Sequence, residues 1–317
     1  MSNRVIVTGA AGFIGRWSVQ PLLSRGFEVH AIVSPARRAA GGISSQLSSA
    51  IVHEVDLLDA TSTERVIDSV RPTHLLHFAW VATPGVYWSS RENFQWVEAS
   101  LRLVRLFGQA GGQRAVVAGT CAEYDWRNAS VCDEDSTPLI SRGQADATPY
   151  AICKSALREM LASFCASSGI GMAWGRIFYL YGPGEHPERL VASVIGNLLR
   201  GQPTRCTHGR QVRSFLHVAD VGQAFAALLD SKVDATVNVG SEEPVAIADV
   251  ILEIARQLDG VELLHFGSRP TDPREPERLL PNTSRLRQLV GWKPRIVLRE
   301  GIEDAINWWR AQLDVHA

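Results

Sequence analysis

The chain begins with a short apolar run that leads directly into a glycine-rich turn, and this pairing limits the possible folds more than any other feature. Residues Arg4–Thr8 read Arg-Val-Ile-Val-Thr, which predicts a buried parallel strand. Gly9, Gly12 and Gly15 follow in Gly-Ala-Ala-Gly-Phe-Ile-Gly, and a helical apolar pattern comes next. Such glycines let the backbone turn tightly and approach a pyrophosphate, which the positive end of the helix attracts. The turn therefore predicts a dinucleotide site.

Alternating strand-like and helical runs continue from this turn. Further strands are predicted at Glu28–Val33, Ala50–Glu54, Thr73–Phe78, Ala115–Gly119 and Gly171–Ile177. Helices are predicted at Thr61–Val70, Ser89–Ala110 and Thr148–Ser168. This alternation is typical of an α/β protein with a doubly wound, Rossmann-type parallel sheet.

The length of the chain predicts two lobes, because 317 residues exceed what one hydrophobic core usually serves, about 250–300 residues. We expect residues 1–177 to form a dinucleotide-binding Rossmann domain, joined by about 216–240, where Leu216–Val239 reads as helix plus strand. Residues 178–317 are expected to form mainly a smaller substrate-binding lobe. This part contains Tyr-Gly-Pro-Gly at 181–184, a helix near Glu188–Gly201 and a Pro- and Arg-rich loop over Arg269–Pro281.

Composition is that of an ordinary enzyme. With 45% hydrophobic residues and a net charge of −1, the chain has neither the basic balance of a nucleic-acid binder nor the acidity of a disordered tail. Its five cysteines lack a Cys-x-x-Cys spacing, which argues against a disulfide framework or a metal site. No apolar run of about 18 residues is present, and the first strand leaves no room for a signal peptide. We expect a cytoplasmic protein with no membrane, nucleic-acid or metal partner.

The segment after the second predicted strand bears on the choice of cofactor. An NAD-binding fold usually places an acid there for the adenosine ribose, but no Asp or Glu occurs between Val29 and Ser49. The segment instead carries Ser34, Arg37 and Arg38, and two guanidinium groups can hold a 2′-phosphate bidentately. The sequence therefore favours NADP(H), with NAD(H) possible. The alternative is that Arg37 and Arg38 are solvent-exposed loop residues that bind no phosphate, which would give the same sequence pattern.

A tyrosine and a lysine four residues apart are the first candidates for chemistry. Tyr150 and Lys154 share one face of the predicted helix. A nearby ammonium stabilises a phenolate and so lowers the pKa of a tyrosine toward neutrality. Only three of the chain's 32 basic residues are lysines, the others being Lys232 and Lys293, which makes this placement notable.

Two further polar residues follow predicted strands. Thr120 comes after the fifth strand, at the carboxyl edge of the sheet, where its hydroxyl can bond a carbonyl under reduction. Asp56 follows the third strand and is a candidate for the adenine amino group. Both residues also have an alternative, purely structural interpretation. Threonine is common at strand ends, and an aspartate that only caps a helix would give the same sequence pattern as Asp56.

Together these residues identify the chain as resembling the extended short-chain dehydrogenase/reductases, in the group of nucleotide-sugar epimerases, dehydratases and reductases. The resemblance covers nearly the whole length and rests on six segments. These are the Gly9–Gly15 turn with Thr8, His77-Phe78-Ala79, Thr120 with Glu123-Tyr124, Tyr150 with Lys154, Arg176 with Tyr181-Gly-Pro183, and Gly209 to Asp220 with Gln211, Arg213 and His217.

The resemblance implies specific roles. Tyr150 is the implied proton donor or acceptor, Lys154 tunes its pKa and binds the ribose, and Thr120 orients the substrate oxygen. Arg213 is the implied ligand of the sugar-nucleotide diphosphate, assisted by Arg269 or Arg274. The cofactor-binding set is Gly9, Gly12, Phe13, Ile14, Gly15, Ser34, Arg37, Arg38, Asp56, Leu57, Phe78, Ala79, Tyr150 and Lys154. The substrate-binding set is Trp80, Tyr87, Trp88, Glu123, Tyr179, Arg213 and Arg274.

Departures from the family pattern narrow the expected reaction. Cys121-Ala122 stands where similar 4,6-dehydratases have an Asp-Glu pair, so water elimination lacks its acid and base. Ala122 also replaces the cysteine of the GDP-fucose-forming epimerase-reductases. Tyr179 and Trp96 stand where the family often has asparagine. The aromatic residues Trp80, Tyr87, Trp88, Phe94 and Trp96 either wall a sugar or nucleotide pocket or belong to the core.

The resulting hypothesis is an NADPH-dependent C4-ketoreductase of a nucleotide-linked 4-keto-6-deoxyhexose, in deoxysugar or polysaccharide biosynthesis. An NAD(P)-dependent nucleotide-sugar 4-epimerase is the alternative, because it uses the same triad and retains its cofactor. A non-catalytic NADP-binding sensor is a third interpretation, against which the intact triad argues. The helices at Ser89–Ala110 and Thr148–Ser168 are expected to pair across a homodimer interface, as in similar enzymes.

Overall fold

A seven-stranded parallel sheet forms the centre of the molecule. The computed structural model describes residues 3–39, 45–144, 146–273 and 275–314. Within them the sheet has the strand order β12-β7-β5-β4-β1-β2-β3, and every neighbouring pair is parallel. The strands are β1 (Arg4–Thr8), β2 (Glu28–Val33), β3 (Ile51–Glu54), β4 (His74–His77), β5 (Arg114–Thr120), β7 (Gly171–Ile177) and β12 (Thr236–Val239). This arrangement confirms the predicted doubly wound fold.

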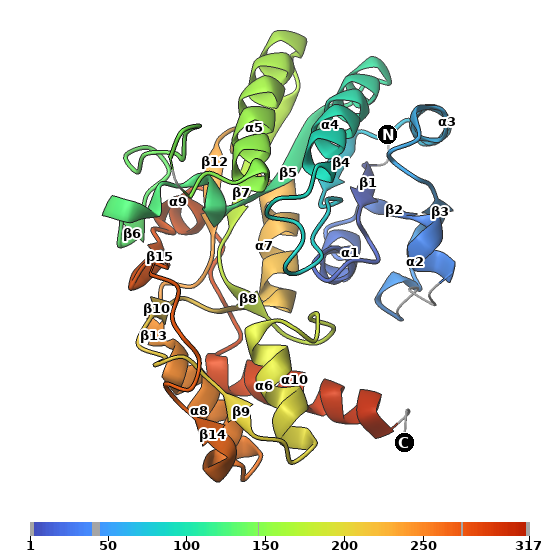
Figure 1. Cartoon of the computed structure of the whole chain (residues 1–317). Helices are drawn as coiled ribbons and strands as arrows, with labels where there is room; N and C mark the ends of the chain where they lie inside the picture. The colour runs from blue at the N-terminus through green and yellow to red at the C-terminus, as the bar shows by residue number, and fades with distance from the viewer. Residues whose placement is uncertain (1–2, 40–44, 145, 274, 315–317) are drawn as a thin grey trace.

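Helices cover both faces of the sheet (Figure 1). On one face, α1 (Gly15–Leu23) and α7 (Val218–Asp230) bury apolar side chains such as Val19 and Phe225. On the other face, α3 (Ala60–Val70), α4 (Glu92–Gln109) and α5 (Pro149–Ser168) bury Leu103 and Leu157. Burial of a face by each helix is what stabilises this layered packing.

The strand order reverses beside β1. Strands β2 and β3 lie on one side of β1, whereas β4 and the strands that follow lie on the other. Loops therefore diverge at the carboxyl ends of β1 and β4, and in open α/β sheets ligands bind in the crevice at this switch point. The glycine-rich turn follows β1 at this place.

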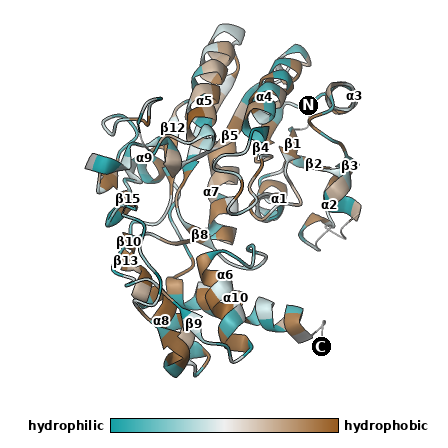
Figure 2. Cartoon of the chain, in the orientation of Figure 1, coloured by the Kyte–Doolittle hydropathy of each residue, from teal (hydrophilic) through white to brown (hydrophobic). Residues whose placement is uncertain are grey.

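A second core lies under the C-terminal part of the chain. It is formed by α6 (Leu190–Leu199), α8 (Ile247–Gln257) and α10 (Leu298–Asp314), and Figure 2 shows hydrophobic residues along α6 and α8. Its four-stranded sheet has the order β13-β10-β15-β6. The remaining bounds are β6 (Val131–Cys132), β8 (Leu180–Tyr181), β9 (Thr204–Arg205), β10 (Val212–Arg213), β11 (Leu216–His217), β13 (Val245–Ala246), β14 (Leu264–His265), β15 (Arg278–Pro281), α2 (Pro35–Ala39) and α9 (Ser284–Gln288), with single 3-10 turns at Ser45–Leu47, Cys121–Glu123, Trp126–Asn128 and Val261–Leu263.

Two short strands differ from the sequence-based expectation. β6 lies within residues 1–177 but pairs with β15, so the chain contributes to the C-terminal sheet well before residue 177. β15 occupies the last four residues of the predicted Arg269–Pro281 loop, where it also pairs with β10. Both strands are stabilised by partners distant in sequence, and strands this short carry no periodic signal. Among the described residues, no helix has the length and apolarity needed to cross a membrane.

Candidate active site

The glycine-rich turn is closed so tightly that a side chain would clash with the backbone at two of its glycines. Gly9 has a φ of +64°, and a Cβ on this residue would lie 2.9 Å from the backbone nitrogen of Ala79. A Cβ on Gly15 would lie 2.2 Å from the Gly9 carbonyl oxygen. The turn therefore needs glycine at both positions, and it brings the first turn of α1 to the carboxyl edge of the sheet. Phe13 and Ile14, the other predicted cofactor contacts of the turn, are half-buried at the start of α1.

The segment after β4 is attached to this turn through a buried polar chain. The Thr8 hydroxyl lies 2.6 Å from His77 Nδ1 and accepts a hydrogen bond from the Ala79 amide at 3.2 Å. His77 Nε2 in turn bonds the Ser100 hydroxyl on α4. Burial lowers the pKa of His77 to about 3, so the ring is neutral at pH 7. These hydrogen bonds hold Ala79 against Gly9. The ring of Phe78 packs on Phe225.

The predicted 2′-phosphate ligands lie on α2, directly after β2. The side chains of Arg37 and Arg38 are exposed. Arg38 forms an ion pair with Glu54 of β3, with 3.2 Å between Nε and Oε2. Ser34 Oγ accepts a hydrogen bond from the Arg37 amide. Arg38 therefore has a carboxylate partner, whereas no ion pair among the described residues includes Arg37.

Asp56 and Leu57 follow β3. One Asp56 carboxylate oxygen accepts a hydrogen bond from the Leu58 amide at 2.9 Å, and the side chain is exposed. Leu57 is buried in the core. Asp56 therefore shapes its own loop, and its second oxygen remains available at the sheet edge.

Thr120, Tyr150 and Lys154 converge from β5 and α5. Thr120 ends β5, and its hydroxyl accepts a hydrogen bond from the Ala122 amide at 3.2 Å. Thr148 caps α5, so Tyr150 lies in the first turn of the helix and Lys154 in the next. The Lys154 ammonium donates to the Ala118 carbonyl oxygen at 2.9 Å and lies 3.8 Å from the centre of the Trp80 ring. Both contacts hold the ammonium at the carboxyl end of β5.

Burial controls the protonation of this group. It raises the pKa of the Tyr150 phenol above its ordinary value, and a hydrogen bond with Thr120 opposes that rise. Burial lowers the pKa of Lys154 to about 7, against the opposing charge of Glu123. The expected lowering of the Tyr150 pKa therefore does not dominate in this structure. Tyr150 is held as a neutral phenol, the form that can donate a proton.

Aromatic residues surround the Tyr150 ring. Tyr87 and Trp88 meet it edge-on, with ring centres 4.8 Å and 5.6 Å away. Trp80 contacts Lys154 as described above, so these three predicted substrate residues gather beside the triad. Phe94, in contrast, is 60% exposed and packs into no core. Trp96 packs on Trp80 within the core of α4 and α5.

Glu123, a predicted substrate-binding residue, lies in a buried polar network behind Thr120. The side chain is fully buried, and its carboxylate accepts hydrogen bonds from the Thr120 amide, Trp174 Nε1 and Arg176 Nε. These donors satisfy both oxygens in a site closed to solvent. Glu123 therefore holds the end of β5 against β7 and positions Thr120, and its predicted contact with the substrate stays a prediction.

Arg213 and Tyr179 lie together at the boundary of the two cores. The Arg213 guanidinium is fully buried, pairs with Glu275 at 2.9 Å and lies 5.3 Å from the centre of the Tyr179 ring. Burial raises the pKa of Tyr179 to about 12. Arg269 follows in the same lobe, and its amide bonds the Cys206 carbonyl. Arg274 lies outside the described residues.

Asn93 is a site residue that the sequence analysis missed. It is fully buried in the first turn of α4, and its amide nitrogen donates to the carbonyl oxygens of Tyr87 and Ser90. Its oxygen accepts a hydrogen bond from Trp80 Nε1 at 2.8 Å. Asn93 thus positions the aromatic residues beside the triad. An asparagine in a first helical turn resembles an ordinary cap in sequence, so only the fold reveals this role.

Three kinds of comparison show which known proteins this chain is similar to. The model of the NAD dependent epimerase/dehydratase family matches residues 5–240. A UDP-N-acetyl-alpha-D-glucosaminuronate decarboxylase of Bacillus cytotoxicus is 26% identical over 98% of this chain and 98% of its own. The UDP-glucose 4-epimerase of Thermus thermophilus, solved as a complex with NAD, is 26% identical, with a TM-score of 0.80 over 97% of this chain and 99% of its own. The UDP-glucose 4-epimerase of Thermotoga maritima, solved with UDP-glucose, is similar in fold, with a TM-score of 0.85 at 21% identity over 98% of this chain and 99% of its own.

The described residues contain no group of three or more His, Cys, Asp and Glu side chains arranged to hold a metal ion.

Proposed function

Because this chain belongs to the NAD dependent epimerase/dehydratase family, as the resemblance in its motifs predicted, we propose that it is an NADPH-dependent ketoreductase. Its proposed substrate is a nucleotide-linked 4-keto-6-deoxyhexose, which is reduced at C4 in deoxysugar or polysaccharide biosynthesis. The observation that carries the proposal is the end of β2. Arginines replace the usual acid there, and Arg37 has no carboxylate partner among the ion pairs of the described residues.

The residues at the switch point fit a dinucleotide. The turn from Gly9 to Gly15 would hold the pyrophosphate, because its three glycines have no Cβ to block the backbone and the turn opens α1. Asp56 would accept the adenine amino group, and Lys154 would bind the ribose. A bound nicotinamide supplies hydride to a carbonyl carbon.

Tyr150 supports the second half of a reduction, the delivery of a proton. Burial keeps its phenol protonated, so the hydroxyl can donate to the C4 oxygen as negative charge develops there. Thr120, at the end of β5, would share that charge through a hydrogen bond. The Lys154 ammonium, held by the Ala118 carbonyl, would stabilise the phenolate left behind.

The large sheet and the C-terminal helices have separate hydrophobic cores, which supports separate binding roles for the two lobes. We propose that the N-terminal lobe binds the cofactor and that the C-terminal lobe supplies the contacts to the nucleotide diphosphate. Arg213 is the proposed diphosphate ligand, with Arg269 or Arg274 beside it. The Arg213 guanidinium lies beside the Tyr179 ring. The ion pair between Arg213 and Glu275 would have to weaken when a diphosphate binds to Arg213. Trp80, Tyr87 and Trp88 would then contact the sugar.

A 4-epimerase is the second candidate, and one observation favours it. The Thermus thermophilus protein with a similar fold and 26% identity is a UDP-glucose 4-epimerase bound to NAD. The same triad serves both reactions. A 4,6-dehydratase receives less support, because Cys121 and Ala122 provide no carboxyl pair after Thr120.

Cofactor stoichiometry separates the two candidates. The purified protein is incubated with a panel of nucleotide sugars and their 4-keto derivatives while NADPH absorbance is followed. A reductase consumes one NADPH for each sugar reduced. Interconversion of two 4-hydroxy sugars without a change in absorbance would replace the reductase with the epimerase. In deuterated water, the product should carry no carbon-bound deuterium at C3 or C5 above the uncatalysed background.

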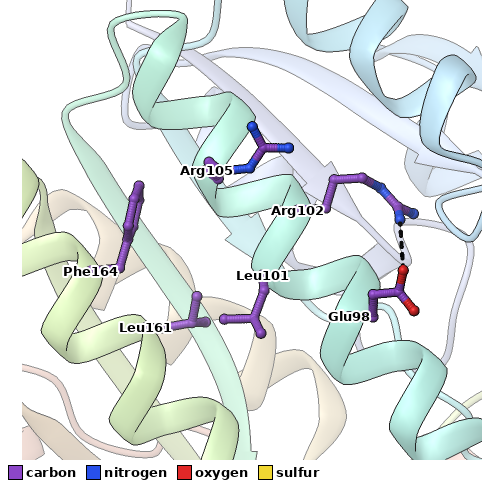
Figure 3. A pocket seen from close by; sticks show the side chains of 6 residues that line it. All are labelled: Glu98, Leu101, Arg102, Arg105, Leu161 and Phe164. Atoms are coloured by element: carbon purple, nitrogen blue, oxygen red, sulfur yellow. Dashed lines mark ion pairs between the residues drawn. The ribbon is translucent and has the colours of Figure 1, made fainter.

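We further propose a homodimer formed through α4 and α5. A groove of about 380 Å³ between these helices is lined by Leu101, Leu161 and Phe164 together with Glu98, Arg102 and Arg105 (Figure 3). Met160, also on α5, is 41% exposed. Such a mixed apolar and charged face is suited to an isologous contact with a second copy. All five cysteines are free in the structure, which supports the proposed cytoplasmic location.

A further inference from the structure

The Lys154 ammonium is buried with no carboxylate in direct contact. Lys154 is 4% exposed, and the ion pairs of the described residues do not include it. Its neighbours are the Ala118 carbonyl oxygen at 2.9 Å and two indole rings, those of Trp80 and Trp174, whose centres lie 3.8 Å and 5.9 Å from Nζ. A buried ammonium is costly unless negative charge balances it. The groups around Lys154 must therefore supply negative potential.

Trp174, on β7, joins this ammonium to a buried carboxylate. Its Nε1 donates to both oxygens of Glu123, at 2.9 Å and 3.1 Å, while its ring lies within cation–π range of Lys154. Glu123 and Trp174 are both fully buried, so solvent does not screen the carboxylate charge. An indole that donates its N–H to a carboxylate is polarised, and its ring then stabilises a cation better. Trp174 thus carries negative potential from Glu123 to Lys154.

Gly119 makes room for the contact between Trp174 and Glu123. A Cβ on Gly119 would lie 2.0 Å from Trp174 Nε1 and 2.6 Å from Glu123 Oε1. The same Oε1 accepts a hydrogen bond from the Thr120 amide at 2.8 Å, and Oε2 accepts one from Arg176 Nε at 2.8 Å. Neighbouring strands β5 and β7 therefore form a fitted site for this carboxylate directly behind the end of β5.

The other ionisable groups near Lys154 carry no negative charge at pH 7. Burial, together with the charge of Lys154, lowers the pKa of His77 on β4 to about 3, so its ring is neutral. Tyr150 lies on the same helix as Lys154, and burial raises the pKa of its phenol. Burial lowers the pKa of Lys154 itself, whereas the charge of Glu123 raises it. Glu123 is therefore the acidic group that opposes the effect of burial on Lys154.

We propose that Glu123 is a positioning residue of the reaction, which fixes Thr120 through its amide and, through Trp174, keeps Lys154 an ammonium. The inference rests on the proposed function, in which Lys154 stabilises the phenolate of Tyr150 and Thr120 shares the charge on the substrate oxygen. This role needs no contact between Glu123 and the substrate. It makes the protonation of the triad depend on a carboxylate and an indole held behind the sheet edge.

The titration of Lys154 can be read directly, because the chain contains only three lysines. Protein labelled with ¹³C at lysine Cε is titrated by NMR without cofactor or substrate, and Lys154→Met identifies the Lys154 signal by its loss. The wild-type Lys154 pKa should be about 7. Glu123→Gln should lower it by about one unit, because the balancing charge is lost. Trp174→Phe keeps an aromatic ring but removes the Nε1 donor, and should lower it by about half a unit.

Further variants separate the charge of Glu123 from its packing. Glu123→Asp keeps the charge and should hold the Lys154 pKa closer to the wild-type value than Glu123→Gln does. Glu134→Gln is the matched control, because this half-buried carboxylate bonds the Asn238 amide at 2.9 Å, and it should shift the Lys154 pKa by less than about 0.3 units. Glu123→Gln with Arg176→Met leaves no unpaired buried charge and should also lower the Lys154 pKa. The melting temperature of each variant shows whether it is folded.

Two results would overturn the proposal. An unchanged Lys154 pKa in folded Glu123→Gln, or in the double variant where the single one does not fold, would show that Glu123 does not keep Lys154 charged. A lowered pKa in Glu123→Gln with no change in Trp174→Phe would refute the part played by Trp174. Turnover adds a second readout: the ammonium is lost as pH rises through its pKa, so the alkaline fall of turnover should move to lower pH in Glu123→Gln. Because the NMR titration uses no substrate, failure of the ketoreductase assay would refute the proposed function and leave the effect of Glu123 on Lys154 standing.

Discussion

Tyr150 carries the most specific chemical role in the proposed reaction. Tyr150→Phe removes the hydroxyl and keeps the ring that meets Tyr87 with centres 4.8 Å apart. Turnover should fall by a factor on the order of 10² to 10⁴, because the proton donor is lost while substrate and cofactor contacts remain. NADPH affinity should change by less than about twofold, measured by fluorescence titration. Unaltered turnover would remove Tyr150 from the mechanism.

Lys154 predicts a dependence of stability on pH. Burial lowers its pKa to about 7 in the folded chain, whereas an unfolded lysine titrates near 10.5. Between these values the unfolded state binds more protons, so this residue makes the free energy of unfolding rise with pH from about 7 toward about 10.5. Lys154→Met removes the buried charge. It should stabilise the cofactor-free protein at pH 6, and the gain should shrink at pH 9.

Urea unfolding of both proteins at the two pH values measures this difference. Lys293→Met is the matched control, because Lys293 is exposed and should produce no pH-dependent difference. The same Lys154→Met variant should lose most of its turnover, since the ammonium is the proposed stabiliser of the phenolate. A gain that stays constant from pH 6 to pH 9 would show that the Lys154 pKa is not lowered.

The sequence predicted the triad at the residue scale but not its surroundings. Tyr150 and Lys154 are four residues apart on a helix, so their shared face follows from local geometry. The contact between Lys154 and Trp80 joins residues far apart in the chain. The role of Asn93 depends on a loop that folds over it, and that of Glu123 on Arg176 from another strand. No local pattern encodes such contacts.

At the scale of elements, one arginine adds hydrogen bonds between the sheet and the C-terminal end of α7. Arg114 of β5 donates through Nε to the Leu229 carbonyl oxygen and through Nη2 to that of Leu228, both in the last turn of α7, and Nη2 also donates to the carbonyl oxygen of Val233 in the loop that follows. A cation at this end also complements the helix dipole. Arg114→Met should destabilise the protein by about 3 kcal/mol, because buried carbonyl groups lose a charged donor. Urea unfolding at pH 7 measures the loss.

Asp234 provides the control for this prediction. It pairs with Arg114 at 2.6 Å, but its side chain is 57% exposed. Asp234→Asn should therefore cost about 1 kcal/mol or less, since solvent screens an exposed charge. If the two variants lose equal stability, the ion pair rather than the helix-end hydrogen bonds fastens α7.

Sequence patterns located the long elements well and the short ones poorly. The strand Glu28–Val33 was predicted to the residue, because a short, mainly apolar run bounded by turns is typical of a buried parallel strand. β6 and β15 contain two and four residues and exist through pairing with each other. Their formation depends on the tertiary arrangement, which local propensity does not describe.

At the scale of the whole molecule, the two lobes meet at the switch point. Arg16 of the N-terminal lobe lies so close to Gly184, in the loop that leads to α6, that a Cβ on Gly184 would be 3.0 Å from Arg16 Nη1. The predicted boundary at residue 177 missed that β6 crosses into the C-terminal sheet. Such crossings fix one lobe against the other, so a cofactor bound at the turn would also contact the lobe proposed to bind substrate.

The proposed dimer gives the last prediction, and it concerns the outer face of α4 and α5. Met160 of α5 is 41% exposed and precedes Leu161, which lines the groove between α4 and α5 with Leu101 and Phe164 (Figure 3). Light scattering at micromolar concentration should give twice the mass of one chain. Met160→Glu should shift the protein toward monomer, because a contact across this face would bury the new charge in both copies. Leu289→Glu is the matched control, since Leu289 is a 61% exposed apolar residue at the end of α9, and it should leave the dimer intact. A monomeric wild type, or equal dissociation of both variants, would show that this face is not the interface.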